Sequence, residues 1–167
     1  MADYKDPENT LLIETTKGNV VIEMRPDLAP NHVAHIKKLA REGKYDGVVF
    51  HRVIDGFMAQ TGDVKFGNSK GGDTSRAGMG GSDYPDLKAE FNAEPHTRGV
   101  VSMARAQNPN SANSQFFIVF DDARFLDRQY TVWGKVIEGM ENVDKIKRGE
   151  PVRDPDSMVS VKVAADA

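Results

Sequence analysis

The sequence predicts an all-β barrel whose ends are plugged by two helices. Three observations lead to this prediction: β-rich runs are numerous, only two segments have helical spacing, and neither a repeat nor a linker divides the chain. A closed sheet has no exposed edges, which favours a barrel for many antiparallel strands. Periodicity alone does not distinguish a barrel from a sandwich. The 167 residues are a usual length for one domain.

The first ordered signal is a β-hairpin. Residues 11–16 and 20–24 are β-rich and flank the turn-like sequence Lys17-Gly18-Asn19. We expect residues 1–10 to form a flexible N-terminal extension and residues 11–167 to form the single domain.

Two segments have the character of helices. Val33, Ile36 and Leu39 recur at helical spacing after Pro30, and Gly43 offers a C-cap. A second, short helix is expected over residues 140–147. The remaining β-rich runs predict strands at residues 48–54, 100–104, 115–120, 131–137 and 158–163.

Composition excludes several classes of protein. The 22 Lys and Arg residues against 25 Asp and Glu give a net charge of -3, so binding to nucleic acid or to a membrane surface is not expected. No apolar run approaches the roughly 20 residues of a membrane span, and residues 1–6 lack the features of a secretory signal. The absence of cysteine excludes disulfides and thiolate chemistry. A cytoplasmic location is the simplest expectation.

Motifs for metals, nucleotides and acyl transfer do not match. His32 and His35 are three residues apart on the first predicted helix, whereas the metalloprotease pattern needs His-Glu-x-x-His, so we expect ordinary helix-surface positions and no metal. The glycines at 71–81 fit neither the Walker nor the Rossmann pattern, and no Gly-x-Ser-x-Gly elbow or evident Ser, His and acid arrangement is present. No cofactor is expected.

A glycine-rich segment covers residues 62–81 and holds seven of the 15 glycines. Its length and lack of periodicity predict a surface loop. Either the loop has a function of its own or it is shaped only by its turns.

The most informative segment is the predicted strand over residues 48–54. Alternation would place Phe50, Arg52 and Ile54 on one face. Such an arginine could be an edge residue whose stem covers apolar surface, or part of a binding groove. A second segment, residues 101–118, joins two predicted strands through a polar, turn-rich loop. Together the two segments suggest a groove that accepts an apolar group and hydrogen-bonds a peptide backbone beside it.

Three motifs lie in order along the chain and resemble one known family. They are Phe50-His51-Arg52-Val53-Ile54-x-Gly56-Phe57-Met58-x-Gln60-x-Gly62-Asp63, then Ser114-Gln115-Phe116-Phe117-Ile118, then Phe125-Leu126-Asp127 before Trp133-Gly134-Lys135-Val136. This pattern resembles the cyclophilin family of peptidyl-prolyl cis-trans isomerases, from about Leu11 to Val163. The segments Glu90-Phe91-Asn92 and Ala104-Arg105-Ala106-Gln107-Asn108-Pro109 resemble bacterial cytoplasmic members.

The resemblance implies a mainly β fold, a closed eight-stranded antiparallel barrel capped by two α-helices, with the active groove on its outer face. It implies Arg52 as the catalytic residue. It also implies a set of substrate-binding residues: Phe57, Met58, Gln60, Ala104, Arg105, Gln115, Phe117, Phe125, Leu126 and Tyr130.

Three positions depart from the family pattern. Arg105 stands where many members have Asn, Phe125 where many have Trp, and Tyr130 where many have His. Because Phe125 has no indole N–H to donate, we expect at most weak binding of cyclosporin.

The implied reaction is rotation about Xaa-Pro bonds in proline-containing peptides and unfolded or exposed protein segments, which assists folding. No bond is broken, so neither nucleophile nor metal is needed. Two alternatives remain: a proline-peptide binding module or chaperone without significant turnover, and a barrel that binds a small ligand inside. We expect a monomer.

Overall fold

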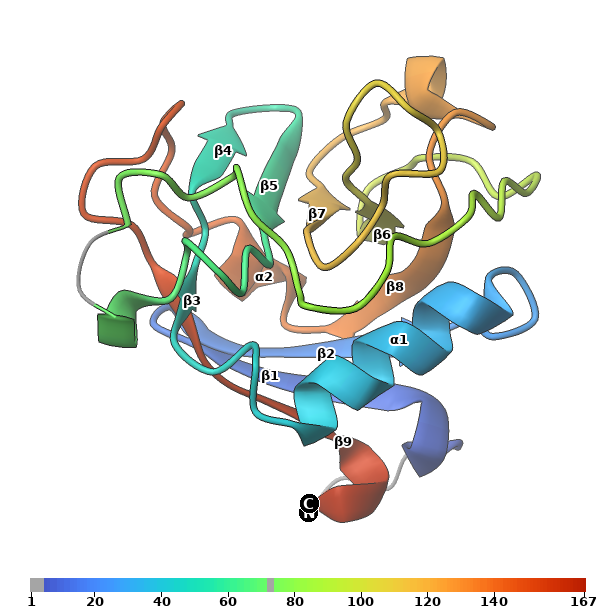
Figure 1. The fold of residues 1–167 in the computed structure, drawn as a ribbon, viewed down its shortest axis with the longest axis horizontal. Helices are drawn as coiled ribbons and strands as arrows, with labels where there is room; N and C mark the ends of the chain where they lie inside the picture. The colour runs from blue at the N-terminus through green and yellow to red at the C-terminus, as the bar shows by residue number, and fades with distance from the viewer. Residues whose placement is uncertain (1–4, 72–73) are drawn as a thin grey trace.

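The computed structural model describes residues 5–71 and 74–167. Its strands form one antiparallel sheet in the order β3-β9-β1-β2-β8-β6-β7-β5-β4 (Figure 1). The strands are β1 (Thr10–Thr15), β2 (Gly18–Met24), β3 (Val48–Val49), β4 (Arg52–Ile54), β5 (Met58–Thr61), β6 (Val100–Met103), β7 (Phe116–Val119), β8 (Val132–Glu138) and β9 (Ser157–Val163). The helices are α1 (Pro30–Arg41) and α2 (Met140–Val143), with short 3-10 turns η1 (Pro7–Asn9), η2 (Ser69–Gly71), η3 (Arg124–Leu126) and η4 (Ala164–Asp166).

The sheet curls back on itself. Its two edge strands, β3 and β4, are separated along the chain only by Phe50 and His51. The Thr61 hydroxyl at the end of β5, next to the β4 edge, donates to the Val49 carbonyl of β3 at 2.9 Å and joins the two ends of the sheet. The mainly β fold with two helices is confirmed, but β3 and β4 do not pair, so the ladder is not closed all the way round. The sheet has nine strands, against the eight that the resemblance implies and the seven β-rich runs: the run 48–54 forms two strands, and β5 had no predicted run.

The interruption changes which way the side chains of this run point. Phe50 packs in the barrel core with Val48 and Val53. Ile54 instead packs against a second hydrophobic cluster. Phe50 and Ile54 therefore do not share a face, because strict alternation holds only within an unbroken strand.

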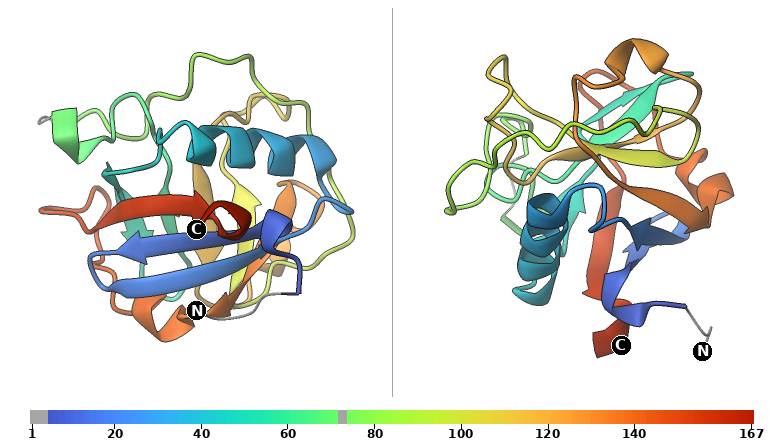
Figure 2. Two further views of the ribbon diagram at one scale, coloured as in Figure 1. Left: turned by 90° about the horizontal axis from the view of Figure 1, so that it is seen from below. Right: turned by 90° about the vertical axis from the view of Figure 1, so that its right-hand side faces the viewer.

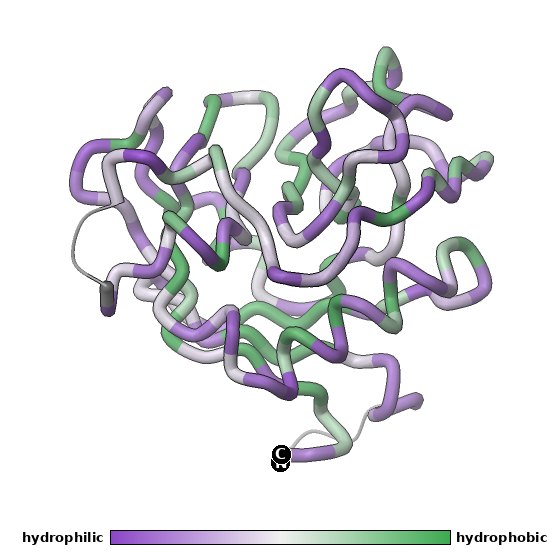
Figure 3. The backbone as a smooth tube through the Cα atoms, viewed as in Figure 1, coloured by the Kyte–Doolittle hydropathy of each residue, from purple (hydrophilic) through white to green (hydrophobic). Residues whose placement is uncertain are grey.

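The barrel interior is filled by aromatic and branched side chains. Phe116 meets Trp133 and Tyr45 edge-on, with ring centroids 5.4 and 5.7 Å apart. All three residues are fully buried, and the Tyr45 hydroxyl donates to the Ser114 carbonyl at 2.8 Å. Figure 3 shows hydrophobic stretches along the strands, whereas the long connection from β5 to β6 is mostly hydrophilic or neutral. Each fully buried large side chain contributes about 1.5–3 kcal/mol.

The two helices lie on opposite sides of strands β9, β1 and β2 (Figure 2, left). As predicted, α1 buries Val33, Ile36 and Leu39. The second helix is shorter than the predicted span 140–147. After Val143, the Lys145 and Ile146 N–H groups bond to carbonyls three residues back, and the Lys147 N–H donates to Asp156 instead of continuing the helix.

The expectation of surface positions for His32 and His35 is wrong. Their residues are 0% and 9% exposed. The Glu90 carboxylate, far away in sequence, accepts hydrogen bonds from the His32 backbone N–H at 2.9 Å and from the His32 ring Nδ1 at 2.5 Å. Burial lowers the pKa of both histidines. Glu90 thus satisfies the start of α1, which has no side-chain cap of its own.

The predicted N-terminal extension covers residues 1–10, of which 1–4 lie outside the described residues. Pro7–Asn9 form η1, and Thr10 begins β1. The Glu8 carboxylate pairs with Lys37 and Arg41, and hydrogen bonds from Arg41 and Lys37 lower its pKa to about 2. Within the described part of the chain, no helix is long and apolar enough to cross a membrane.

Candidate active site

Four residues form a row across the outer face of the sheet. Arg52 on β4 stands opposite Gln60 on β5, Gln60 stands opposite Phe117 on β7, and Phe117 stands opposite Ser102 on β6. Directly opposed residues in a sheet project to the same side. The register therefore places a cation, an amide and an aromatic ring side by side.

A groove with a volume of about 410 Å³ opens over this row. Its lining residues are His51, Arg52, Phe57, Met58, Gln60, Ala77, Gly78, Met79, Ala104, Arg105, Phe117, Leu126, Tyr130, Glu150 and Pro151. The structure thus gathers every predicted site residue here except Gln115 and Phe125.

The apolar part of the groove rests on a second hydrophobic cluster outside the barrel core. Met58, Phe117 and Leu126 belong to it, and Phe57 packs against it. Leu126 comes from η3, and Tyr130 meets Phe117 edge-on with ring centroids 5.8 Å apart. These side chains form an apolar pocket directly beside the polar row.

The Arg52 guanidinium is held from two sides. Its Nε donates to Glu150 Oε2 at 2.5 Å, and its Nη1 donates to Gln60 Oε1 at 3.4 Å. The planar guanidinium holds its donors in a fixed fork, so two acceptors fix the direction in which the remaining donors point. The Arg52 side chain is 41% exposed and is therefore accessible to a ligand in the groove.

Gln115 lies behind Gln60. Its Oε1 accepts from Gln60 Nε2 at 3.0 Å, and its own Nε2 donates to the carbonyls of Gly78 and Gly80 at 3.0 and 2.9 Å. This arrangement orients the Gln60 amide with its oxygen toward Arg52. Gln115 is a positioning residue for Gln60, and it lines a neighbouring hollow instead of the groove.

The glycine-rich loop is organised by one buried carboxylate. Asp63 is 0% exposed, and its two oxygens accept from the backbone N–H groups of Lys65, Phe66, Gly78 and Gly80. These bonds compensate for burying the charge. They also hold the loop in the position in which the Gly78 and Gly80 carbonyls accept hydrogen bonds from the Gln115 side chain. Residues 72–73 of this loop lie outside the described residues.

At the start of the loop, Gly62 is a position where no residue with a Cβ atom fits. Gly62 has φ of +96°, and a Cβ atom there would lie 2.5 Å from the Ser114 carbonyl oxygen. The close approach brings the start of the loop against the segment that leads into β7.

Phe125 and Arg105 lie at the rim. The Phe125 residue is 71% exposed and its ring centroid is 5.6 Å from that of Phe57. The Arg105 guanidinium donates to the carbonyls of Gln129, Ala106 and Gln107 and lies 4.5 Å from the Tyr130 ring centroid. Arg105 thus braces the loop after β6 against the segment that carries Tyr130.

The structure contains a Ser, His and acid arrangement that sequence spacing did not show. His96 Nε2 lies 2.9 Å from Ser102 Oγ, and His96 Nδ1 lies 3.1 Å from Asp127 Oδ1. Ser102 and His96 are 0% exposed, so no substrate reaches the hydroxyl. The His96 ring stacks on Phe117 at 6.2 Å between centroids. The arrangement supports the groove from behind and is not an acyl-transfer site.

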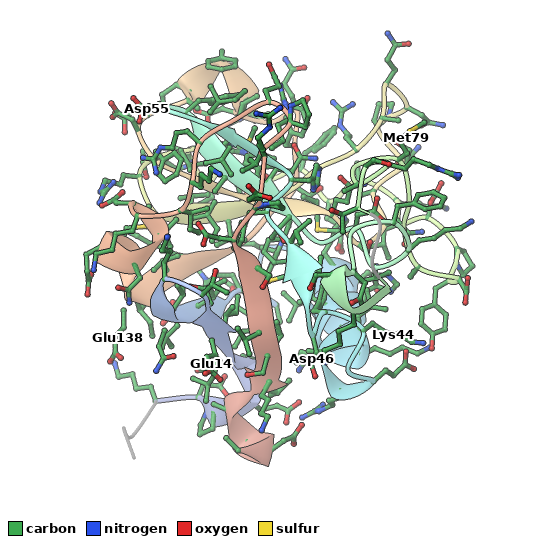
Figure 4. All side chains as sticks on the ribbon, turned by 90° about the vertical axis from the view of Figure 1, so that its left-hand side faces the viewer. Glu14, Lys44, Asp46, Asp55, Met79 and Glu138 are labelled. Atoms are coloured by element: carbon green, nitrogen blue, oxygen red, sulfur yellow. The ribbon has the colours of Figure 1, made fainter. Side chains whose placement is uncertain are left out.

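Sequence reasoning missed one wall of the groove. Glu150 and Pro151 follow α2 and line the groove, and Glu150 contacts Arg52, 98 residues away in sequence, a contact that no local spacing signals. Met79, at the other side, is 78% exposed. In Figure 4, Met79 and Asp55 lie in one half of the molecule, and Lys44 and Asp46 lie in the other. Asp55 is in the turn between β4 and β5.

The groove on the outer face of the sheet places a cation beside an apolar pocket. Comparisons with known proteins show the family of a chain with this fold and site. The family model described as cyclophilin type peptidyl-prolyl cis-trans isomerase/CLD matches residues 10–165. A protein of Brucella suis biovar 1 named probable peptidyl-prolyl cis-trans isomerase is 62% identical and covers 99% of this chain and 87% of its own length. A peptidyl-prolyl cis-trans isomerase of Synechococcus elongatus is 37% identical over 93% of this chain and 97% of its own.

Solved structures show the same relationship. The crystal structure of a cyclophilin from Hirschia baltica has a TM-score of 0.84 at 35% identity, covering 97% of this chain and 76% of that one. A cyclophilin type isomerase from Cryptosporidium parvum, determined in the presence of the dipeptide Ala-Pro, has a TM-score of 0.80 at 25% identity, covering 92% of this chain and 98% of that one. The chain therefore belongs to the cyclophilin family of peptidyl-prolyl cis-trans isomerases.

Proposed function

We propose that Arg52 is the catalytic residue of this isomerase and that the groove over β4, β5 and β7 binds proline-containing peptides. The observation that carries the proposal is the position of the Arg52 guanidinium, fixed by Gln60 and Glu150, next to an apolar pocket. The related isomerase from Cryptosporidium parvum, whose structure was determined in the presence of Ala-Pro, supports a proline peptide as the occupant.

The chemistry needs only a better fit to the twisted amide than to either planar isomer. Rotation about the Xaa-Pro bond is slow because the amide has partial double-bond character, with a barrier of about 18–20 kcal/mol. When the bond twists, the proline nitrogen loses conjugation and gains a localised lone pair. The Arg52 donors stabilise that lone pair in a fixed position, and each 1.36 kcal/mol gained gives about tenfold in rate.

The apolar pocket holds one side of the rotating bond. Phe57, Met58, Phe117 and Leu126 take the pyrrolidine ring, whose burial anchors the proline while the preceding residue turns. The Ala104 backbone N–H donates to the Gln115 carbonyl at 3.0 Å and is not available to a ligand. Ala104 therefore pairs with the peptide through its backbone carbonyl. Phe125 and Tyr130 lie at the edge of the pocket and add apolar surface.

Rates and affinities together test this proposal. Exchange NMR on a short Ala-Pro peptide measures the cis-trans rate with the wild-type protein and with Arg52→Ala, each shown to be folded. We expect acceleration by the wild type and its loss in the variant. A wild type that binds the peptide but leaves its rate unchanged would make the protein a proline-peptide binding module or chaperone instead.

We also propose that the protein acts as a cytoplasmic monomer on unfolded or exposed segments, where proline isomerisation limits folding. The absence of cysteine suits a reducing compartment, and the bacterial relatives suit a bacterial origin. Catalysed refolding of a client limited by a proline bond tests the action on folding chains, and sedimentation tests the monomeric state.

A further inference from the structure

Glu150 is built into the groove wall. On each side of it, the backbone is fixed to the segment that carries Arg52. The Gly149 and Val53 backbones exchange two hydrogen bonds of 2.8 Å, and the Val152 N–H donates to the His51 carbonyl at 3.0 Å. The Glu150 carboxylate therefore has a defined place beside the catalytic guanidinium and does not depend on a freely moving loop.

Two other arginines near the groove are engaged elsewhere. Arg105 is bound to three backbone carbonyls. Arg148 donates to two carbonyls and pairs with Asp55 at 3.2 Å. Among the described residues that line the groove, Glu150 is the one acid. Its side chain is 57% exposed, so the carboxylate meets both Arg52 and a bound peptide.

The position of Glu150 relative to the neighbouring hollow indicates which flank of a bound proline the carboxylate can contact. That hollow shares Gln60, Gly78, Met79, Ala104 and Arg105 with the groove, but its lining does not include Glu150. In the row across the sheet, Glu150 bonds to Arg52, which is at the end opposite to Phe117 and the apolar pocket. The carboxylate therefore meets residues on one flank of the proline only.

We infer that Glu150 is a specificity-determining residue that favours peptides with Lys or Arg on one flank of the proline and disfavours Asp or Glu there. The inference rests on the proposed proline-peptide function. A basic side chain gains attraction to the carboxylate, while an acidic one is repelled by it and competes with it for Arg52. Because the site is partly exposed, the expected preference for Lys over Glu is about two- to fivefold.

Four proteins and five peptides test this inference. The peptides carry Ala on both flanks of proline, or Lys or Glu on one flank at a time. The proteins are wild type, Glu150→Gln, Glu150→Lys and the control Glu141→Gln, which removes the same charge from an exposed position on α2 outside the groove. Exchange NMR gives kcat/KM, and titration gives Kd.

We expect the wild type and Glu141→Gln to prefer Lys over Glu on one flank, Glu150→Gln to bring that ratio close to one, and Glu150→Lys to reverse it. The wild-type preference should fade in 1 M salt, where the Debye length falls to about 3 Å. A ratio that is unchanged in Glu150→Gln, or equal rates for all peptides with the wild type, overturns the inference while the isomerase assignment stands. If no peptide is accelerated, the proposed function fails, and the Kd ratios alone decide the role of Glu150.

Discussion

Arg52 and Gln60 stand directly opposite each other on β4 and β5, and Gln60 Oε1 lies 3.4 Å from Arg52 Nη1. Antiparallel pairing alone brings the two side chains to the same face. Gln115 then fixes which end of the Gln60 amide points at the guanidinium. Catalytic geometry in this protein thus depends on sheet register and on a chain of amides that ends in the glycine-rich loop.

Removing Gln115 tests the chain of amides. We expect Gln115→Ala to lower kcat/KM by about threefold to tenfold, since loss of one supporting hydrogen bond costs about 0.5–1.5 kcal/mol. The loss should lie in kcat more than in KM, because both N–H donors of the Gln115 amide are taken by Gly78 and Gly80 and its oxygen accepts from Gln60. Gln107→Ala, at an exposed position whose backbone carbonyl alone is used by Arg105, is the matched control. A fall in affinity with unchanged kcat would contradict a positioning role.

Removing the Asp63 carboxylate should lower the stability of the protein. Asp63→Ala leaves four backbone N–H groups of the loop without their acceptor, so we expect a loss of about 3–5 kcal/mol in the free energy of unfolding. Asp63→Asn keeps two acceptor lone pairs and should lose less. Urea unfolding measures the stabilities. Equal stability of Asp63→Ala and wild type would show that the loop does not depend on this carboxylate.

Stability should fall as the pH drops below about 6.5, the ordinary pKa of histidine. Burial lowers the pKa of His32, His35, His51 and His96 in the folded protein. The unfolded chain therefore binds protons first, and its free energy falls relative to the folded state. The stabilisation is complete above the unfolded pKa and is lost below it, with at most about 1.4 kcal/mol per pH unit for each histidine.

Urea unfolding between pH 5 and pH 8 measures this dependence. His35→Asn removes one titrating ring and should flatten the slope. The contribution of Asp127 to stability is lost at a lower pH than that of the histidines. Desolvation raises the pKa of Asp127, but hydrogen bonds from Arg124 and His96 outweigh this effect and lower the pKa to about 2. A stability that increased from pH 7 to pH 5.5 would contradict buried, neutral histidines.

The Phe125 ring should limit cyclosporin affinity. Phe125→Trp adds an indole N–H at an exposed position next to Phe57, and we expect cyclosporin to bind about tenfold more tightly, as one added hydrogen bond allows. Phe91→Trp, at another exposed aromatic position that does not line the groove, is the control. Calorimetry gives both affinities. Equal affinities of Phe125→Trp and wild type would show that the indole donor is not what limits binding.

The parts predicted from sequence are those with local causes. Apolar spacing identified α1, and β-rich runs identified most strands, because periodicity reflects which face is buried. Arg52 and Gln60 were identified from the resemblance of residues 50–63 to a family motif that lies within one continuous segment of the chain. The break at Phe50 and His51 was missed, since the bend serves barrel closure and has no local signal.

Other errors have long-range causes. His32 is buried because Glu90, distant in sequence, accepts its hydrogen bonds. Glu150 reaches Arg52 from the far end of the chain. The expectation that Gln115 binds substrate stays a prediction; in the structure its side chain contacts Gln60 and lines the neighbouring hollow.

The central claim is that the Arg52 guanidinium stabilises the twisted amide, and exchange NMR with Arg52→Ala and Arg52→Lys tests it most directly. Titration of the same Xaa-Pro peptide gives Kd for each protein. The account predicts that both variants bind the peptide within a few fold of wild type while Arg52→Ala loses at least about a hundredfold in rate and Arg52→Lys, which keeps the charge without the fork, recovers only part of it. Wild-type exchange rates in Arg52→Ala would contradict it.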